Sequence, residues 1–229
     1  MNRVEIISTE DGSSSLINLD LNETYHSIHG AIQESRHVFI ESGLKSLLQL
    51  SQAKEISILE IGFGTGLNAL LTLLAAKDLN IKVYYEGIEA FPLPMETVAQ
   101  LNYPDLLKSE ESKIVFNSLH QTYWNQTQMI TPNFHLRKCN IKIQEAEFEK
   151  GKFDLIYFDA FAPSKQPEMW ERSILQKVTE AMKPQGIFIT YSAKGQLKRD
   201  LVSLGLSVEK IAGPPGKREM MRATKLTTE

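Results

Sequence analysis

Three glycines at alternate positions, preceded by a carboxylate, form the most informative chemical pattern in this sequence. Glu60, Gly62, Gly64 and Gly66 stand in the run EIGFGTGLN. Glycine permits positive φ angles and lets a ligand lie directly against the backbone. The spacing E-x-G-x-G-x-G differs from the G-x-G-x-x-G of dinucleotide sites, and a carboxylate beside the loop would repel a pyrophosphate. Glu60 suits a cation instead, such as the amino group of an amino acid.

A further acid after this loop points to a nucleoside. Glu89 closes the run VYYEGIE roughly twenty positions after Gly66, near the offset of a carboxylate that binds a ribose. A nucleoside joined to an amino acid is S-adenosylmethionine, so we predict that this molecule binds here, with Asn68 as an additional contact. The alternative is that Glu60 is a solvated acid at a strand end and that the glycines only form a tight turn.

Another acid ends a second apolar run. The run FDLIYFD is typical of a buried parallel strand and closes on Asp159. Ligands of open α/β sheets bind beyond the carboxyl ends of the strands, so we expect Asp159 to lie near the glycine loop. The loop APSKQP that follows contains two prolines and is predicted to shape a pocket. An acid at this position is also commonly a helix cap or a loop anchor.

These residues require a parallel sheet to bring them together. Residues 56–61 are a short, β-branched apolar run, and residues 67–74 carry leucines at helical spacing. Strand, glycine turn and helix in this order predict a Rossmann-like α/β fold with a mostly parallel central sheet. The helix would present unpaired N–H groups and its positive end to the ligand.

Residues 1–50 are predicted to form a small β-hairpin and helical extension that packs on a catalytic domain of residues 51–229. Residues 4–8 and 15–19 are β-type runs around Asp11-Gly12. Residues 24–48 are predicted to be helical, and the hairpin and helix are expected to cover the mouth of the ligand crevice. We interpret His26, His29, His37, His135 and Cys139 as structural, because their spacings do not support a metal site.

The composition is that of an ordinary globular chain, with 229 residues, 42% hydrophobic and 23% charged. This length predicts one domain, or one domain with an appendage. The sequence shows no membrane span and no signal peptide, so we expect a cytoplasmic protein that contacts no membrane. Cys139 is the only cysteine, so no disulfide is expected.

The net charge of −3 is not that of a general nucleic-acid binder, so any such contact needs a local basic patch. Residues 194–225 contain three acids and eight basic residues, namely Lys194, Lys198, Arg199, Lys210, Lys217, Arg218, Arg222 and Lys225. This excess favours contact with phosphates on one face. The spacing fits a solvated, charged helix face equally well.

Four segments together carry a family resemblance. The runs DAFAPSKQPEMW, EIGFGTGLN, IEAFPL and GKREM resemble the methyltransferase domain of the bacterial MnmC family, whose stand-alone form is often called MnmD. The similarity extends from about residue 25 to residue 222. It implies a class I methyltransferase that uses S-adenosylmethionine. Its expected reaction is methylation of the exocyclic amine of 5-aminomethyl-(2-thio)uridine at the tRNA wobble position, which gives 5-methylaminomethyl-(2-thio)uridine.

The resemblance also implies roles for single residues. The cofactor loop matches Glu60, Gly62, Gly64 and Gly66, the ribose acid matches Glu89, and the acid beside the acceptor amine matches Asp159. Asn140 stands where bifunctional relatives carry an acid near the adenine, which puts that contact in doubt. The chain has no room for the FAD domain of those relatives, so a separate enzyme or pathway is expected to supply the aminomethyl base.

The expected substrate contacts lie on two loops. Phe161 and Lys165 follow Asp159, and Lys217 and Arg218 lie in the basic loop GPPGKREM. A base splayed out of the tRNA anticodon can be stacked on an aromatic ring and anchored by cations. Trp170 fits this role or the core equally well.

Methyl transfer from a sulfonium is an in-line displacement that needs alignment of nitrogen, methyl and sulfur, and no metal. An aliphatic amine, with an unperturbed pKa of about 10.4, arrives protonated and is not nucleophilic. Asp159 is expected to hold the ammonium and orient it, or to accept its proton, and the sequence leaves both roles open. Two other functions remain open, a small-amine N-methyl- or aminopropyltransferase and a non-catalytic binding module.

Overall fold

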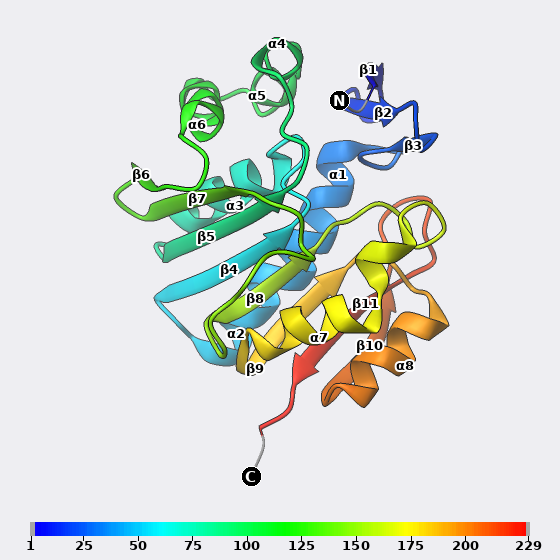
Figure 1. The fold of residues 1–229 in the computed structure, drawn as a ribbon. Helices are drawn as coiled ribbons and strands as arrows, with labels where there is room; N and C mark the ends of the chain where they lie inside the picture. The colour runs from blue at the N-terminus through cyan, green and yellow to red at the C-terminus, as the bar shows by residue number, and fades with distance from the viewer. Residues whose placement is uncertain (1–2, 228–229) are drawn as a thin grey trace.

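An eight-stranded sheet in the order β10-β11-β9-β8-β4-β5-β7-β6 forms the centre of the molecule (Figure 1). The computed structural model describes residues 3–227. The parallel strands are β4 (Glu55–Ile61), β5 (Lys82–Glu89), β7 (Phe134–Asn140), β8 (Phe153–Phe158) and β9 (Met182–Thr190). Antiparallel pairs add β6 (Thr127–Thr131), β11 (Glu219–Lys225) and β10 (Leu206–Ala212) at the two edges. The mostly parallel sheet confirms the predicted fold class.

The central strands are buried on both faces, as their apolar runs predict. Successive side chains of a strand point to opposite faces. Ile58 accordingly belongs to one hydrophobic cluster and Leu59 to the other. Tyr157 and Phe158 divide in the same way on β8. Each face of the sheet therefore has its own core.

Helices cover both faces of the sheet (Figure 1). One side carries α3 (Leu67–Asp78) and a continuous helix made of α1 (Ala31–Ser35), the π-helical η1 (Arg36–Lys45) and α2 (Ser46–Ser51). The other side carries α7 (Arg172–Glu180) and α8 (Gly195–Ser203), which pack on β9 and β10. The remaining helices are α4 (Met95–Val98), α5 (Tyr103–Leu106), α6 (Glu110–Gln121) and the 3-10 turn η2 (Pro167–Trp170). No helix within residues 3–227 is long and apolar enough to cross a membrane.

The N-terminal segment is a small antiparallel sheet followed by a helix that starts later than predicted. The hairpin is confirmed as β1 (Val4–Ser8) and β2 (Ser14–Asn18), and β3 (Glu23–Thr24) adds a third strand. The helix prediction is wrong for residues 24–30. Gly30 has a φ of 145°, and a Cβ there would lie 2.6 Å from an oxygen of Asp11. The backbone must therefore turn before the helix begins at Ala31.

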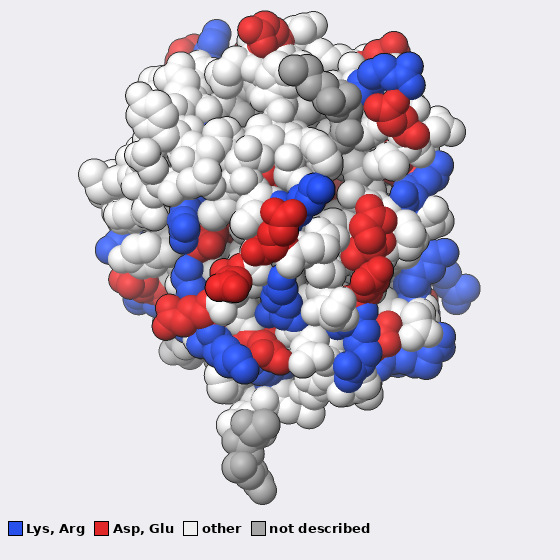
Figure 2. Space-filling model, in the orientation of Figure 1, with Lys and Arg blue, Asp and Glu red and all other residues white. Residues whose placement is uncertain are grey.

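Three of the eight basic residues near the C-terminus pair with acids, and a fourth is held by backbone carbonyls. Lys210 pairs with Glu219 at 2.6 Å and Arg222 with Glu209 at 2.7 Å. The Lys225 ammonium donates to three backbone carbonyls. In the view of Figure 2, Lys and Arg lie among Asp and Glu and do not form one uninterrupted basic field. The excess of basic residues in this segment therefore does not produce an equally strong patch on the surface.

Candidate active site

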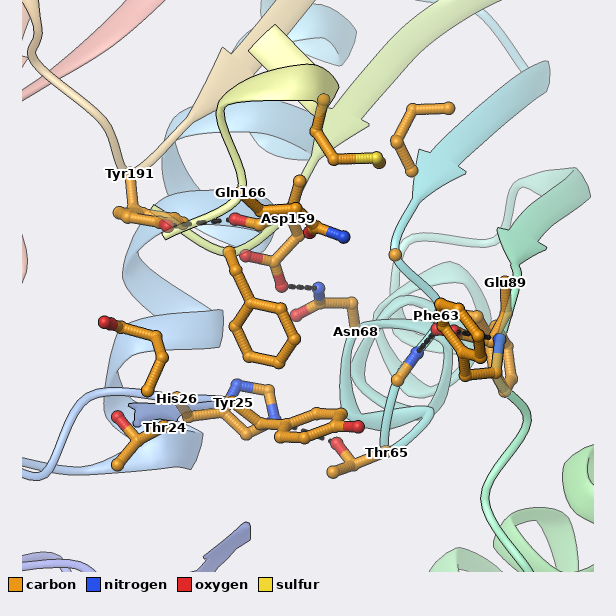
Figure 3. A pocket seen from close by; sticks show the side chains of 18 of the residues that line it. Thr24, Tyr25, His26, Phe63, Thr65, Asn68, Glu89, Asp159, Gln166 and Tyr191 are labelled. Atoms are coloured by element: carbon orange, nitrogen blue, oxygen red, sulfur yellow. Dashed lines mark hydrogen bonds between the residues drawn. The ribbon is translucent and has the colours of Figure 1, made fainter. Parts of the chain in front are cut away.

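A cavity of about 810 Å³ lies beyond the carboxyl ends of β4, β5 and β8 (Figure 3). The glycine loop and the ends of these strands form one wall. Residues 141–145, which follow β7, also contribute. The opposite side includes residues 21–29, which we call the strap, together with α1 and the loop between β10 and β11. The strap and α1 thus lie along the crevice, whereas the hairpin that was predicted to cover its mouth is not among the lining residues.

The glycine loop adopts the conformation that its sequence predicts. Gly62, Gly64 and Gly66 have φ angles of 91°, 49° and 72°, which favour glycine. A Cβ on Gly62 would lie 2.6 Å from the backbone oxygen of Asp159, so glycine lets the ends of β4 and β8 touch. Gly62 and Gly64 line the cavity. Gly66 instead begins α3 and faces His120.

Glu89 is held rigidly at the end of β5 and lines the cavity. One carboxylate oxygen accepts the Gly64 N–H at 3.0 Å, and the other accepts the Phe91 N–H at 2.8 Å. Burial raises the pKa of Glu89, while these N–H groups oppose that effect. Because a carboxylate has about four acceptor positions, Glu89 retains lone pairs for hydroxyl groups of a ligand.

Glu60 lies behind the cavity and is not among its lining residues, so its contact with a ligand stays a prediction. The side chain is fully buried, and it alternates with Leu59 and Ile61 toward the face under α3. There the Asn68 amide donates to the Glu60 carboxylate at 2.9 Å. Burial raises the pKa of Glu60 well above its usual range and so favours the neutral acid.

Asn68 connects this buried acid to the acid in the cavity. The same amide nitrogen also donates to Asp159 at 2.8 Å (Figure 3). Both Asn68 and Asp159 line the cavity. Burial raises the pKa of Asp159 to about 7, the Glu34 charge acts in the same direction, and the Asn68 bond and Lys217 oppose them. Asp159 can therefore accept a proton near neutral pH.

Aromatic rings line the cavity near Asp159. The rings of Tyr25 and Phe161 meet edge to face, with centroids 5.0 Å apart. The Tyr191 hydroxyl donates to the Ala160 carbonyl at 2.9 Å. Trp170, in contrast, packs in the core and donates its ring N–H to Phe161 O at 2.7 Å. These contacts hold the aromatic rings in place, and a planar group fits into the space that they enclose.

Of the four predicted substrate residues, Phe161 and Lys217 line the cavity, whereas Lys165 and Arg218 do not. The Lys165 ammonium donates to Leu21 O at 3.2 Å and to Asn22 O at 2.8 Å, so it anchors the strap. Arg218 is exposed beside Lys217.

Asn140 supports the site without lining it. Its amide donates to the carbonyls of Glu89 and Ala90 at 3.0 and 3.3 Å, across the register pair of β5 and β7. The chain that directly follows, residues 141–145, lines the cavity instead. Asn140 therefore holds the backbone at Glu89 in place.

The strap and two residues beside it, Glu34 and Tyr191, line the cavity but were not predicted as site residues from the sequence. His26 shares a 2.8 Å hydrogen bond with Thr65 and thereby joins the strap to the glycine loop. Burial lowers the pKa of His26 to about 4. His29 bonds Glu10, and His37 donates to Ala212 O. The run TYHSIH before Gly30 could have indicated the strap. Its polar and aromatic side chains do not form the apolar face that a packed helix needs.

The comparisons of this chain with known proteins agree on one family. The family described as S-adenosyl-L-methionine-dependent methyltransferase matches residues 110–226. The tRNA 5-methylaminomethyl-2-thiouridine biosynthesis bifunctional protein MnmC of Leptospira borgpetersenii serovar Hardjo-bovis is 32% identical over 209 residues, which is 87% of this chain and 32% of that protein. MnmC of Idiomarina loihiensis is 28% identical over 229 residues, covering 93% of this chain and 37% of that protein. The chain thus spans about a third of the length of these curated relatives.

A solved structure agrees with the sequence matches. The crystal structure of MnmC2 from Aquifex aeolicus superposes with a TM-score of 0.77 at 26% identity, covering 100% of this chain and 74% of that one. The family match covers half of this chain and includes β8, Asp159 and the loop of Lys217. The chain belongs to the S-adenosyl-L-methionine-dependent methyltransferases.

Proposed function

We propose that this methyltransferase acts on the exocyclic amine of 5-aminomethyl-(2-thio)uridine at the tRNA wobble position and gives 5-methylaminomethyl-(2-thio)uridine. The observation that carries the proposal is Asp159, an acid with a pKa of about 7 that Asn68 holds in the cavity wall. The names of the curated relatives, which refer to biosynthesis of this tRNA base, support the choice of acceptor.

The lining of the cavity suits two cationic reactants. Among lining residues in the described part of the chain, two are lysines and six are acids, namely Glu23, Glu34, Glu89, Glu145, Asp159 and Glu168. A sulfonium and an ammonium repel each other, and surrounding carboxylates offset that repulsion. An anionic cofactor such as a dinucleotide would be disfavoured here.

The residues at the glycine loop fit S-adenosylmethionine. We propose that Glu89 binds the ribose hydroxyls, and that Gly62, Gly64 and Asn68 contact the amino-acid part. Glu60 acts through Asn68, and Gly66 and Asn140 act through the backbone that they position. The volume of about 810 Å³ is sufficient for a nucleoside-sized ligand and part of a second one. S-adenosylmethionine, when bound, supplies an electrophilic methyl group.

Asp159 prepares the acceptor amine. A carboxylate in the cavity attracts the ammonium by a charge-assisted hydrogen bond and can take one proton from it, which frees the nitrogen lone pair for attack. With a pKa of about 7, Asp159 is a stronger base than an ordinary aspartate. The Asn68 amide fixes the carboxylate by donating to one of its oxygens.

We propose that the base enters against the rings of Phe161 and of Tyr25 in the strap, with Lys217 beside it. Arg218, Lys194, Lys198 and Arg199 are the candidates for contact with anticodon phosphates. Lys165 contributes by anchoring the strap. In this account, residues 1–50 form an extension of the catalytic domain of residues 51–229, the enzyme works in the cytoplasm, and another enzyme or pathway supplies the aminomethyl base.

Radiolabelled methyl transfer tests this function. The acceptor is tRNA from cells that lack the terminal methylation, and the products are digested to nucleosides. Label in the 5-methylaminomethyl base supports the proposal, and Asp159→Ala should then abolish the signal. Absence of label, with cofactor binding intact in calorimetry, would contradict it and favour a small amine as the acceptor. Lys210 and Arg222 pair with acids within the chain and are therefore not free to contact tRNA phosphates. For this reason a small amine is tested as a second acceptor.

A further inference from the structure

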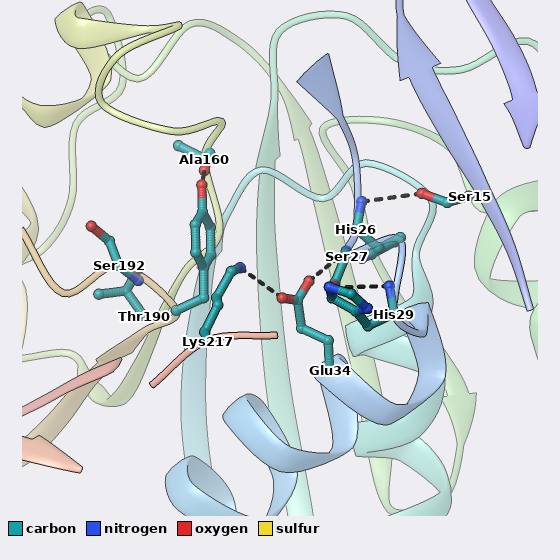
Figure 4. Close-up of polar contacts among 10 residues, drawn as sticks. Ser15, His26, Ser27, His29, Glu34, Ala160, Thr190, Ser192 and Lys217 are labelled. Carbon is teal, nitrogen blue, oxygen red and sulfur yellow. Dashed lines mark hydrogen bonds and ion pairs between the residues drawn. The ribbon is translucent and has the colours of Figure 1, made fainter. Parts of the chain in front are cut away.

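One ion pair in the cavity wall is not explained by cofactor or base binding. The Lys217 ammonium donates to the Glu34 carboxylate at 2.7 Å (Figure 4). Glu34 comes from α1 and Lys217 from the loop between β10 and β11, and both line the cavity that contains Asp159. The Glu34 side chain is only 9% exposed and that of Lys217 is 33% exposed. A lysine paired inside a lining that holds six acids, and that is proposed to receive cationic reactants, requires a reason.

Both members of the pair are fixed by additional contacts. The second oxygen of Glu34 accepts the Ser27 N–H of the strap at 2.9 Å. The Lys217 ammonium lies over the Tyr191 ring, 3.9 Å from its centroid, where cation–π attraction adds to the ion pair. The Tyr191 hydroxyl donates to the carbonyl of Ala160, the neighbour of Asp159 in the chain. The pair is therefore held against the wall that carries Asp159.

For several of the other titratable groups around Asp159, burial favours the neutral form. Burial raises the pKa of Glu60, Tyr85 and Tyr191 and lowers the pKa of His26 to about 4. Glu23 and Glu89 line the cavity from β3 and β5. Glu34 and Lys217 are the charged groups that shift the Asp159 pKa, the first upward and the second downward.

We propose that Glu34 and Lys217 are positioning residues that act as a matched pair of charges and set the protonation of Asp159 in the proposed methyl transfer. Glu34 makes Asp159 a better proton acceptor. Without Lys217, repulsion between the Glu34 and Asp159 carboxylates would keep Asp159 protonated at neutral pH. The inference rests on the proposed function only where it refers to the tRNA reaction.

The two single substitutions have opposite consequences. Lys217→Met leaves the Glu34 charge unbalanced, so Asp159 binds its proton more tightly and the acidic limb of the pH–rate profile moves to higher pH. Glu34→Gln removes the negative charge and leaves Lys217, so the limb moves to lower pH. Each shift is expected to be about one pH unit. The double variant should lie between them, close to the wild type.

The test reads Asp159 directly and also through activity. Aspartate carboxyl groups are labelled with ¹³C, the Asp159 signal is assigned with Asp159→Asn, and the titration of each variant is recorded without tRNA. The pH dependence of kcat/KM for tRNA is measured on the same proteins. Lys217→Arg should restore the wild-type titration. Lys210→Met is the matched control, because Lys210 pairs with Glu219 on the same hairpin but outside the cavity lining.

Opposite shifts in Lys217→Met and Glu34→Gln, with no shift in Lys210→Met, support the inference. Shifts in the same direction, or an unchanged titration in both, overturn it. Glu34→Gln retains an acceptor for the Ser27 N–H, so it remains informative if Lys217→Met folds poorly. If the titrations move as expected but the wild type does not methylate tRNA, the proposed function fails and the action of the pair on Asp159 stands. If tRNA is methylated and the titrations do not move, the inference alone fails.

Discussion

The two sides of the cavity are built in different ways. The side proposed to hold the cofactor consists of the glycine loop and the end of β5, where backbone N–H groups fix Glu89 and where Gly62 allows strand ends to touch. The side proposed to hold the acceptor is made from side chains of the strap, α1 and the loop of Lys217. Its contacts join residues as distant in sequence as Glu34 and Lys217. The first side is a property of a short local sequence, and the second depends on the assembled fold.

This difference predicts that substitutions on the two sides have separable effects. Changes on the glycine-loop side should weaken cofactor binding or the fold. Changes on the acceptor side should alter turnover, its pH dependence or the KM for tRNA while cofactor binding is retained. The following variants test that separation.

Asp159→Ala should have the largest effect. Loss of the group that prepares the amine is expected to lower kcat by about 10² to 10⁴. Calorimetry should still detect S-adenosylmethionine binding with little change in Kd, because Asp159 is proposed to contact the acceptor amine and not the cofactor. Turnover near the wild-type value would exclude the role assigned to Asp159.

The pH dependence of the wild type provides a second test of the same residue. Since the pKa of Asp159 is about 7, the carboxyl is protonated below that pH and cannot accept a proton from the amine. The kcat/KM for tRNA should therefore rise with pH through about 7, and the acidic limb should be absent from the residual activity of Asp159→Ala. A rate that is flat between pH 5 and 8 would contradict this assignment.

Gly62→Ala should damage the glycine-loop side through the fold. Its Cβ would lie 2.6 Å from Asp159 O, and its φ of 91° is unfavourable for alanine. We expect about 2 to 4 kcal/mol of destabilisation in chemical unfolding, together with weaker cofactor binding. Gly151→Ala is the matched control, because Gly151 has a φ of 66° with open space around it, so that variant isolates the backbone term of about 1 kcal/mol. Equal losses in both variants would show that the contact between the strand ends is unimportant.

Glu89→Gln should weaken cofactor binding by about 10- to 100-fold, because an amide cannot accept from both N–H groups and from a ribose. At saturating cofactor, kcat should change little. Calorimetry and saturation kinetics measure the two quantities separately. A fall in kcat with an unchanged cofactor Kd would place Glu89 on the acceptor side. That result would contradict the division of the cavity into a cofactor side and an acceptor side.

Lys165→Met should have the smallest effect. Loss of the two bonds to the strap is expected to raise the KM for tRNA by a few-fold, since each such bond contributes about 1 kcal/mol. Lys183→Met, which removes an ion pair with Asp154 outside the cavity, is its control. An unchanged KM in Lys165→Met would mean that the strap does not need this anchor.

The two sides also differ in how far the sequence predicted them. Gly62, Glu89 and Asp159 follow from local rules for strand ends and glycine turns, and the structure brings them to one cavity. Glu60 does not line the cavity, because strand alternation turns it under α3 toward Asn68, and its contact with a ligand stays a prediction. The mostly parallel sheet and the N-terminal hairpin were predicted for the same local reasons.

The acceptor side escaped prediction because its contacts are long-range. Nothing in the periodicity of the sequence connects Glu34 with Lys217, or Lys165 with the carbonyls of the strap. Residues 24–29 of the strap were mistaken for helix, since the conformation of Gly30 depends on the neighbouring Asp11 in the folded chain. The excess of basic residues in the C-terminal segment left phosphate contact and a solvated face equally open, because a residue count does not show that Lys210 and Arg222 are paired.

The central claim is that this chain methylates the aminomethyl base of tRNA with the help of Asp159. The most direct measurement is transfer of a labelled methyl group from S-adenosylmethionine to tRNA that lacks the terminal methylation, with nucleoside analysis, for the wild type and Asp159→Ala in parallel. The account predicts label in the 5-methylaminomethyl base for the wild type and almost none for the variant. Label in another nucleoside, or equal labelling by both proteins, would contradict it.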